Sequence, residues 1–295
     1  MTEVAALLAC PECGEELQPH DRALRCGTGH SFDIARQGYV GLLTGASTKM
    51  TGDTADMLDA RAAFQGAGHF APIAAALARA LDAGSHADAH PSGGGTGPGR
   101  TVLEIGAGTG YYLAGVLDAH PDLLGIALDV AKPAARRAAR AHPRSAAVLA
   151  DAWRGLPIRD GALTAVLSVF APRNPAEVAR VLAPSGRFVV VTPTARHLGE
   201  LVGPLGMVGV DPDKDRRLAD SLAATFTRAE HTLVEFRMTL TRTDVINVVA
   251  MGPSAFHGTP ADDPRIAALP DVTEVTASVT VSTYLPTPSS SRRDP

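Results

Sequence analysis

Short β-type runs alternate with helix-length segments in the second half of the chain, and this pattern constrains the fold more than any other feature. The runs are TVLEI, LGIAL, AAVLA, LTAVLSVF and RFVVVTP, between residues 101 and 193. Strands separated by helices pair in parallel, and a parallel sheet needs helices on both faces. Two later runs, HTLVEFRMTLT and VTEVTASVTVSTYLP, alternate apolar and polar residues and predict a closing antiparallel pair. The sequence therefore predicts an α/β fold.

The segment VLEIGAGTGYYL, residues 102–113, places glycines between the first predicted strand and a helix. Glycines at such a turn let the backbone approach a ligand closely. A dinucleotide-binding loop requires G-x-G-x-x-G/A, and the two frames of this segment end on Tyr111 and Leu113 instead. The pattern E-x-G-x-G-x-G resembles motif I of the class I S-adenosylmethionine-dependent methyltransferases, whose fold is Rossmann-like.

Acidic residues follow this pattern at the ends of three consecutive predicted strands. They are Glu104, Asp129 after LGIAL, and Asp151 after AAVLA. Ligands of doubly wound sheets bind at the carboxyl ends of the strands. The resemblance implies that Glu104 contacts the methionine end of the cofactor, Asp129 the ribose hydroxyls and Asp151 the adenine. Asp129 and Asp151 are also placed to cap the segments that follow them, a role compatible with ligand contact.

All three cysteines of the chain lie near its start. Together with His30, Cys10, Cys13 and Cys26 form the pattern C-x2-C-x12-C-x3-H. Each half is a short chelating hairpin, and Zn²⁺ prefers four tetrahedral N/S ligands in structural sites. Because four protein ligands leave no position for a catalytic water, the spacing predicts one structural zinc ion. The alternatives are free cysteines and a redox pair at Cys10 and Cys13, which would lack the strand and helix that normally flank such a pair.

Composition excludes several classes of protein. A net charge of -4 does not suit a nonspecific nucleic-acid coat, although a local basic face is compatible with it. The chain has no run of 18 apolar residues and no recognisable signal peptide. We therefore expect a cytoplasmic protein that does not enter a membrane.

The order of motifs resembles one methyltransferase family along nearly the whole chain. After the cysteine motif come FDIARQGYVGLL, GDTADMLDARAAFQGAGHF, EIGAGTGYY, FAPRNPAEVARVLAPSGRFVVVTPTARHL and MGPSAFH. This order is similar to that of the RlmA-type 23S rRNA guanine-N1 methyltransferases. The NP after FAPR is most similar to the actinomycete tylosin-resistance branch. The resemblance covers the chain from Cys10 to Tyr284.

The resemblance implies ligands, substrate and assembly. Zinc would be bound by Cys10, Cys13, Cys26 and His30, and S-adenosylmethionine by Phe70, Glu104, Gly106, Gly108, Thr109, Gly110, Asp129, Asp151 and His197. Phe70 departs from the family's tyrosine, so the stacking surface is kept and a hydroxyl is lost. The implied substrate is a guanine in a hairpin of 23S rRNA near the macrolide site, and its methylation would protect the cell against tylosin-type macrolides. A homodimer that forms an RNA cleft is also implied.

Two further segments are candidates for contact with RNA. FAPRN, residues 170–174, follows the fourth strand, where many class I nitrogen methyltransferases hold the target base. There Phe170 can stack, and Asn174 or a backbone carbonyl can accept the N1 proton. FAPRN contains no carboxylate, so no catalytic base is named. The second segment is basic and can contact phosphate, its alternative being a solvated helix face: Lys132, Arg136, Arg137, Arg140 and Arg144.

These patterns predict four regions: a zinc-binding RNA-recognition module (1–38), a helical connector and flexible linker (39–99), a methyltransferase domain (100–285) and a disordered tail (286–295). Within the connector, Asp53 or Thr54 is suited to cap the first helix, and residues 84–99 lack periodicity. LAPSGR, residues 182–187, predicts a helix exit and a tight turn.

Two other functions are compatible with parts of the sequence. A small-molecule methyltransferase of secondary metabolism would share the cofactor loop but would not need the zinc module. A non-catalytic, zinc-stabilised RNA-binding protein would need the zinc module, but the intact glycine loop and Asp129 argue against it.

Overall fold

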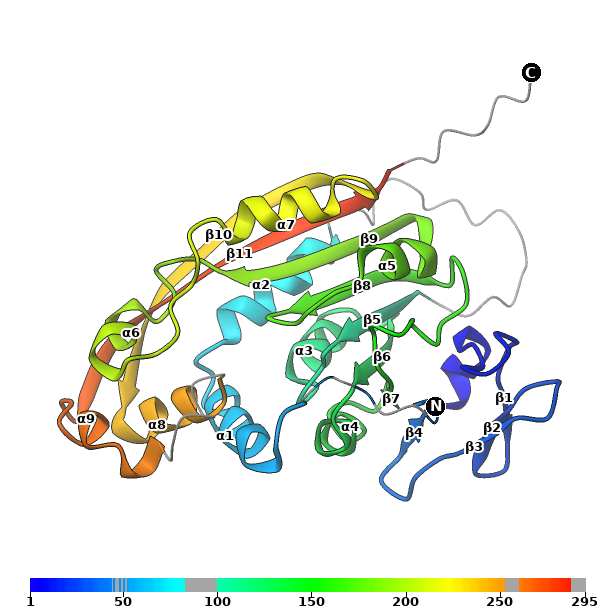
Figure 1. Ribbon diagram of the computed structural model, residues 1–295, viewed down its shortest axis with the longest axis horizontal. Coiled ribbons are helices and arrows are strands. Elements are labelled where there is room, and N and C mark those ends of the chain that lie inside the picture. Colours follow the sequence, from blue (N-terminus) through cyan, green and yellow to red (C-terminus); the bar gives the residue numbers. More distant parts are fainter. Residues whose placement is uncertain are drawn as a thin grey trace.

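The computed structural model describes residues 1–43, 45, 48, 50, 52–82, 100–252 and 260–287. Its centre is an eight-stranded sheet (Figure 1). The strands are β4 (Tyr39–Gly41), β5 (Thr101–Ile105), β6 (Leu124–Asp129), β7 (Ser145–Leu149), β8 (Leu163–Val169), β9 (Leu182–Pro193), β10 (Phe226–Thr241) and β11 (Val272–Pro286). Their order across the sheet is β10-β11-β9-β8-β5-β6-β7-β4.

The sheet is parallel from β9 to β4 and antiparallel at its other edge. β11 pairs antiparallel with both β9 and β10, which confirms the predicted closing pair. The strand order is that of the predicted class I methyltransferase fold, with β4 added at one edge. Residues 39–41 were expected in the connector, but β4 pairs in parallel with β7, Tyr39 lying opposite Ala147. Three residues next to a glycine are too short a run to show strand periodicity in a sequence.

Helices cover both faces of the sheet. They are α1 (Ala55–Gly66), α2 (Ala71–Asp82), α3 (Tyr111–Ala119), α4 (Lys132–Ala138), α5 (Pro175–Val181), α6 (Gly199–Leu205), α7 (Lys214–Leu222), α8 (Arg242–Ala250) and α9 (Pro264–Ala267), with 3-10 turns η1 (Thr2–Leu7) and η3 (Pro260–Asp262). Thr54 caps α1, as predicted, by accepting a hydrogen bond from the Met57 amide at 3.2 Å.

Side chains of alternate residues along the central strands pack in two separate hydrophobic clusters. Val102 of β5 packs in the cluster that contains residues of α2, α3 and α8. Leu103 packs in the other cluster, with residues of α5, α7 and the N-terminal module. Both side chains are fully buried, because a parallel strand in a doubly covered sheet has no solvent face.

The N-terminal module is a small antiparallel sheet that is docked on the larger one. Its strands are β1 (Gln18–His20), β2 (Ala23–Arg25) and β3 (Ser31–Asp33), and it lies at the end of the molecule opposite α8 and α9 (Figure 1). The amide of Ala9 donates to the carbonyl of Pro157 at 3.0 Å, and the Arg159 side chain pairs with Glu16 at 2.6 Å. The loop after β7 therefore anchors the module.

Residues 182–187 contain the predicted tight turn, because a Cβ on Gly186 would lie 2.8 Å from the carbonyl oxygen of Ala183. α5 ends at Val181, as predicted, but β9 already begins at Leu182, ahead of the turn. Leu182 pairs with Leu163, and a register shift then brings Arg187 opposite Ala165. β9 has more residues than β8 between these two pairs, and the extra residues form a bulge within the sheet.

The linker at 84–99, the MGPSAFH motif beyond Gly252 and the tail from residue 288 lie outside the described residues. Within the part that is described, β11 extends to Pro286, the first residue of the predicted tail. No helix there has the length and apolarity needed to cross a membrane.

Candidate S-adenosylmethionine and zinc sites

A cavity of about 760 Å³ opens at the carboxyl ends of β5, β6, β7 and β8. Its wall includes the predicted site residues Phe70, Glu104, Gly106, Asp129, Asp151, Phe170 and His197. The parallel strands bring these side chains to one edge of the sheet, although they come from segments more than 100 residues apart. This is the position at which doubly wound sheets bind ligands.

Asp129 ends β6 and holds two backbone amides with its carboxylate. Oδ2 accepts a hydrogen bond from Gly108 at 2.8 Å, and Oδ1 accepts one from Ala131, also at 2.8 Å. The second bond orients the start of α4. Each carboxylate oxygen keeps a free lone pair. Asp129 can therefore fix the glycine loop and still accept hydrogen bonds from two vicinal hydroxyls.

Glu104 is enclosed at the base of the cavity and is only 1% exposed. Its Oε2 accepts a hydrogen bond from the Leu113 amide at 3.1 Å. Burial raises the pKa of Glu104 to about 8, and the nearby charge of Asp129 adds to the effect. A cationic group that entered the cavity here would stabilise the ionised carboxylate.

The glycine loop is held in left-handed backbone conformations that side chains disfavour. Gly106 has φ +69°, and a Cβ on it would lie 2.7 Å from Cβ of Ala171. Gly108 has φ +56°, and its Cβ would lie 2.9 Å from Nη1 of Arg61. Of the loop residues predicted to contact the cofactor, Gly106 lines the cavity, whereas Gly108, Thr109 and Gly110 lie behind its wall. The Thr109 hydroxyl instead donates to Oε1 of Gln65 at 2.7 Å.

Asp151 follows β7 and lines the cavity at the end of this strand. Its Oδ2 accepts from the Thr48 hydroxyl at 2.6 Å, and its Oδ1 accepts from the Trp153 amide at 3.0 Å. It thus caps the next turn, as its sequence position suggested. Trp153 is 51% exposed and lines the cavity beside it, so an aromatic face adjoins the carboxylate.

An aromatic cluster forms the wall beyond β8. The ring of Phe170 lies 6.3 Å from that of Phe70 and 5.7 Å from that of His197, centroid to centroid. Phe70 is buried, whereas Phe170 is 41% exposed and has φ +54°. A large residue rarely adopts this conformation, and such strain clusters at functional sites. The conformation leaves an aromatic side chain at the mouth of the cavity.

His197 belongs to the same wall and is neutral. Burial, and to a smaller extent the charge of Lys214, lowers the pKa of His197 to about 4. Its Nδ1 lies 3.2 Å from the Ser278 amide, which donates to it. Nε2 therefore carries the proton and is a hydrogen-bond donor.

The zinc ligands converge in the N-terminal module. The Sγ atoms of Cys13 and Cys26 are 3.7 Å apart, and Nδ1 of His30 is 3.5 Å from Sγ of Cys10. All four ligand atoms lie within 4.8 Å of one another. A tetrahedral zinc with Zn–S bonds of about 2.3 Å has sulfur atoms about 3.8 Å apart, so this arrangement fits the ion. The Thr28 hydroxyl lies 3.0 Å from Sγ of Cys26 and is placed to donate to it.

Comparisons with known proteins agree with both sites. The family model described as RlmA, N-terminal, a zinc ribbon, matches residues 8–47. The chain is 46% identical to the 23S rRNA (guanine(748)-N(1))-methyltransferase of Streptomyces fradiae, over 97% of this chain and 99% of that protein. A Micromonospora griseorubida protein, whose name places it among the 23S rRNA (guanine-N1)-methyltransferases, is 50% identical over 95% of this chain and 97% of its own length.

The chain belongs to the RlmA-type 23S rRNA (guanine-N1)-methyltransferase family. A crystal structure described as a Bacillus halodurans methyltransferase is also similar, with a TM-score of 0.45, 15% identity and coverage of 71% of this chain and 97% of that one. The RlmA-type assignment rests on the full-length relatives.

The cavity of this RlmA-type protein fits S-adenosylmethionine. The cofactor carries an ammonium and a sulfonium, and the cavity offers the carboxylates of Glu104, Asp129 and Asp151. Oη of Tyr112 is buried beside them without a hydrogen-bond partner among the described residues. A buried hydroxyl without a partner is costly, and a bound polar ligand removes that cost.

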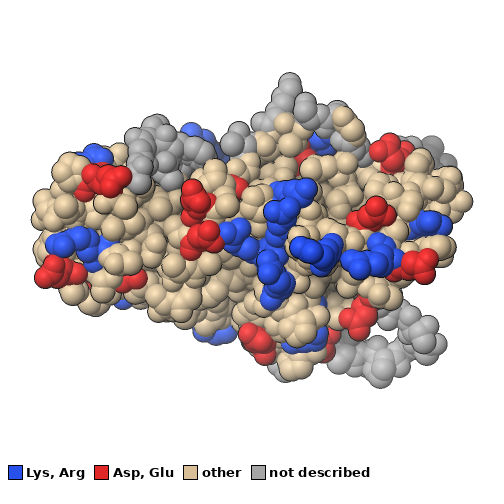
Figure 2. Space-filling view, turned by 90° about the horizontal axis from the view of Figure 1, so that it is seen from below, with Lys and Arg blue, Asp and Glu red and all other residues tan. Residues whose placement is uncertain are grey.

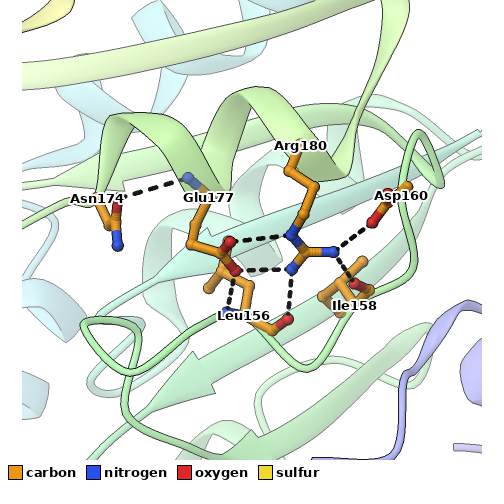
Figure 3. Close-up of polar contacts among 6 residues, drawn as sticks. All are labelled: Leu156, Ile158, Asp160, Asn174, Glu177 and Arg180. Atoms are coloured by element: carbon orange, nitrogen blue, oxygen red, sulfur yellow. Dashed lines mark hydrogen bonds and ion pairs between the residues drawn. The ribbon is translucent and has the colours of Figure 1, made fainter. Parts of the chain in front are cut away.

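Asn174 does not line the cavity, contrary to its predicted place at the target base. It caps α5, where its Oδ1 accepts from the Glu177 amide at 3.4 Å (Figure 3). Further along α5, Arg180 donates to the carbonyls of Leu156 and Ile158, each at 2.8 Å. The Asn174 side chain is thus used to cap α5. Through Arg180, α5 also holds the loop after β7, against which the zinc ribbon packs.

The predicted basic stripe separates into two groups. Arg144 donates to the carbonyls of Leu123 and His120 at 2.6 and 2.9 Å, and Arg137 pairs with Asp59. These two arginines are structural. The exposed members follow one another at helical spacing on and just beyond α4: Lys132, Arg136 and Arg140. Figure 2 shows Lys and Arg side chains gathered across the middle of the face on which α4 lies.

Several site residues had no signal in the sequence. Gln65 and Tyr112 lie on helices and read as ordinary helical positions, and Thr28 is a loop hydroxyl. Lys214 lies in a charged stretch, DPDKDRR, that resembles any solvated helix start. Tertiary packing brings Gln65, Tyr112 and Lys214 to the cavity, whereas Thr28 lies at the zinc site because it is two residues from both Cys26 and His30.

Proposed function

We propose that this protein methylates N1 of a guanine in a hairpin loop of its 23S rRNA, at the position equivalent to the guanine 748 of the Streptomyces fradiae enzyme's name. The observation that carries the proposal is the half-exposed Phe170 at the mouth of the cofactor cavity. An enzyme that acts on the pairing edge of a base must extract the base and hold it, and an aromatic face is the usual support.

The chemistry requires a donor and an acceptor held in line. S-adenosylmethionine supplies the methyl group from its sulfonium when it is bound. The protein orients this donor through Glu104, Asp129 and Asp151, and Phe170 holds the plane of the guanine above it. Much of the rate acceleration can come from this near-attack geometry.

In this proposal the zinc ribbon binds the RNA hairpin. This role is supported by the ribbon's fixed place beside the loop of residues 154–160, which starts near the cofactor cavity. The exposed cations Lys132, Arg136 and Arg140 would contribute contacts to phosphate. The homodimer implied by the family resemblance stays a prediction, which sedimentation of the pure protein tests.

The decisive experiment combines the protein with labelled S-adenosylmethionine and protein-free 23S rRNA. We expect one labelled guanine and a block to primer extension at that position. Transfer to a small molecule with unmodified RNA would overturn the proposal in favour of a metabolic methyltransferase. RNA binding without any transfer would favour a non-catalytic RNA-binding protein.

A resistance role follows from the same proposal. A macrolide-sensitive host that expresses the wild-type chain should tolerate tylosin-type macrolides better than a host that expresses Asp129→Ala. Equal sensitivity of the two hosts, with fully methylated rRNA in the first, would separate methylation from resistance.

A further inference from the structure

Lys214 occupies an unusual position at the start of α7. It lines the cofactor cavity together with Phe170 and His197, and its side chain is half-buried. Its amide donates to the carbonyl of Asp211, but among the charged side chains that line the cavity in the described part of the chain, that of Lys214 alone has no hydrogen-bond or ion-pair partner. A lysine that is partly withdrawn from water and left without a partner is a candidate for chemistry.

Other titratable groups of the cavity are less suited to take a proton from a base. His197 already accepts a hydrogen bond at Nδ1 and carries its proton on Nε2. Asp211 pairs with Arg217 and Asp53 with Arg61. Glu104, Asp129 and Asp151 lie at the strand ends assigned to the cofactor. These engagements leave the Lys214 side chain as the group without a partner in the cavity that Phe170 also lines.

The surroundings of Lys214 favour its unprotonated form. Burial lowers the pKa of Lys214, and the positive charge of Arg173, from the loop after β8, lowers it further. Arg173 is itself partly buried, and its Nη1 is buried without a partner among the described residues. His197 faces the same region as a neutral ring, while Asp211 and Arg217 neutralise each other.

We propose that Lys214 is the base that removes the N1 proton of the target guanine, an inference that rests on the function proposed above. The unprotonated Nζ takes the proton, and the electron pair of the N–H bond stays on N1. N1 then forms a bond to the methyl carbon while the carbon–sulfur bond breaks with its electrons passing to sulfur, which leaves a neutral thioether. Lys214 is left as an ammonium and returns its proton to solvent.

The same wall matches the edge of guanine. A guanine presents an acceptor at O6 next to the donor N1–H, and the wall offers a donor at Nε2 of His197 and an acceptor at Nζ of Lys214. Adenine presents the opposite order, a donor amino group next to an unprotonated N1. Lys214 therefore contributes to base selection as well as to proton removal.

The test compares Lys214→Met and Lys214→Arg with the wild type under single-turnover conditions. Both variants should lose about 10²–10⁴-fold in methyl-transfer rate, because neither side chain can accept a proton at neutral pH. Affinity for S-adenosylmethionine, measured by calorimetry, and thermal stability should change little. The matched control is Arg216→Met, which removes an exposed cation from the same helix outside the cavity and should keep the wild-type rate.

Two further readouts separate a base from a positioning cation. The wild-type rate should rise with pH and level off at a lower pH than that at which guanine N1 itself ionises, because the pKa of Lys214 is lowered. In Lys214→Met the rate should continue to rise until guanine N1 itself ionises. Small primary amines should restore activity to Lys214→Ala in proportion to their unprotonated concentration.

A wild-type rate in Lys214→Arg, or in Lys214→Met, would overturn the assignment of Lys214 while leaving the proposed function intact. Failure of the wild-type enzyme to modify any guanine N1 would instead overturn both. Loss of cofactor affinity in parallel with the rate, in every Lys214 variant, would assign the residue to cofactor binding and contradict a role as base.

Discussion

Asp129 and Gly108 are joined by a hydrogen bond of 2.8 Å between a side-chain carboxylate and a backbone amide, although 21 residues separate them. The bond ties the end of β6 to the glycine loop that follows β5. Both groups are buried, so the bond holds the loop and the carboxylate in one relative position in the absence of a ligand. The cofactor site is therefore largely preformed.

Replacement of Asp129 should weaken the fold and the cofactor site together. Asp129→Ala leaves the buried amides of Gly108 and Ala131 without an acceptor, at a cost of about 1–3 kcal/mol for each amide. We expect a lower urea midpoint and a marked loss of S-adenosylmethionine affinity by calorimetry. Exposed Asp122→Ala serves as the control. Unchanged cofactor affinity in Asp129→Ala would contradict the assigned role.

Glu104 should make the stability of the ligand-free protein depend on pH. Its pKa is raised to about 8 in the fold from 4.5, so folding favours the protonated form. The stabilisation is complete below pH 4.5 and is lost as the pH rises through 8. The free energy of unfolding, measured from pH 5 to pH 8.5, should therefore fall less steeply in Glu104→Gln than in the wild type.

Cofactor binding should release protons from the same residue. An ammonium group beside Glu104 favours its ionised form, so calorimetry at pH 7 in buffers of different ionisation enthalpy should report release of about one proton. Glu104→Gln should release none. Equal proton release in the two proteins would place the cationic end of the cofactor elsewhere.

Loss of zinc should abolish rRNA methylation and spare cofactor binding. Cys26→Ser removes a thiolate ligand, and elemental analysis should find no zinc in the variant. Affinity for S-adenosylmethionine should change by less than about tenfold, or about 1.4 kcal/mol. His20→Ala, on the same ribbon but outside the ligand set, should retain zinc. A Cys26→Ser protein that bound rRNA normally but not the cofactor would assign the ribbon a different role.

The exposed cations of α4 should contribute a salt-dependent part of rRNA binding. Conversion of Lys132, Arg136 and Arg140 to Gln should weaken binding and reduce the slope of log K against log salt by about 2–3, with each phosphate contact accounting for about 0.7–0.9. The control converts Arg216, Arg237 and Arg265, which are exposed elsewhere, and changes the net charge equally. Equal slopes in both triple variants would show that the effect depends on net charge alone.

The predictions that held in the fold rest on local patterns. The alternating runs identified the strands, and Asp129 and Asp151 could be placed at strand ends because parallel strands all end at one edge of the sheet. The spacing of Cys10, Cys13, Cys26 and His30 predicted a set of ligand atoms that do converge. In each case the residues that determine the structure are close together in the sequence.

The predictions that failed depended on distant partners. β4 is a strand only because β7, more than 100 residues later, offers it an open edge. Asn174 is an exception: it was expected at the target base, but it caps α5 by accepting from the Glu177 amide only three residues later. Lys214 and Gln65 enter the cavity region through packing between separate helices. Short stretches of sequence contain no sign of the partners of β4, Lys214 and Gln65, whereas the run Asn-Pro-Ala-Glu at 174–177 is a local helix-start signal.

The ribbon and the methyltransferase sheet share one hydrophobic cluster, in which Cys10 and Leu24 lie with Leu103 and Phe188. The two parts therefore pack as one body, which sets the span from the zinc ligands to Phe170. An RNA hairpin gripped by the ribbon would offer to Phe170 whichever nucleotide lies at that span. The distance along the RNA stem from the ribbon contact would then determine which nucleotide is methylated. One added base pair in the stem would redirect methylation to a neighbouring nucleotide.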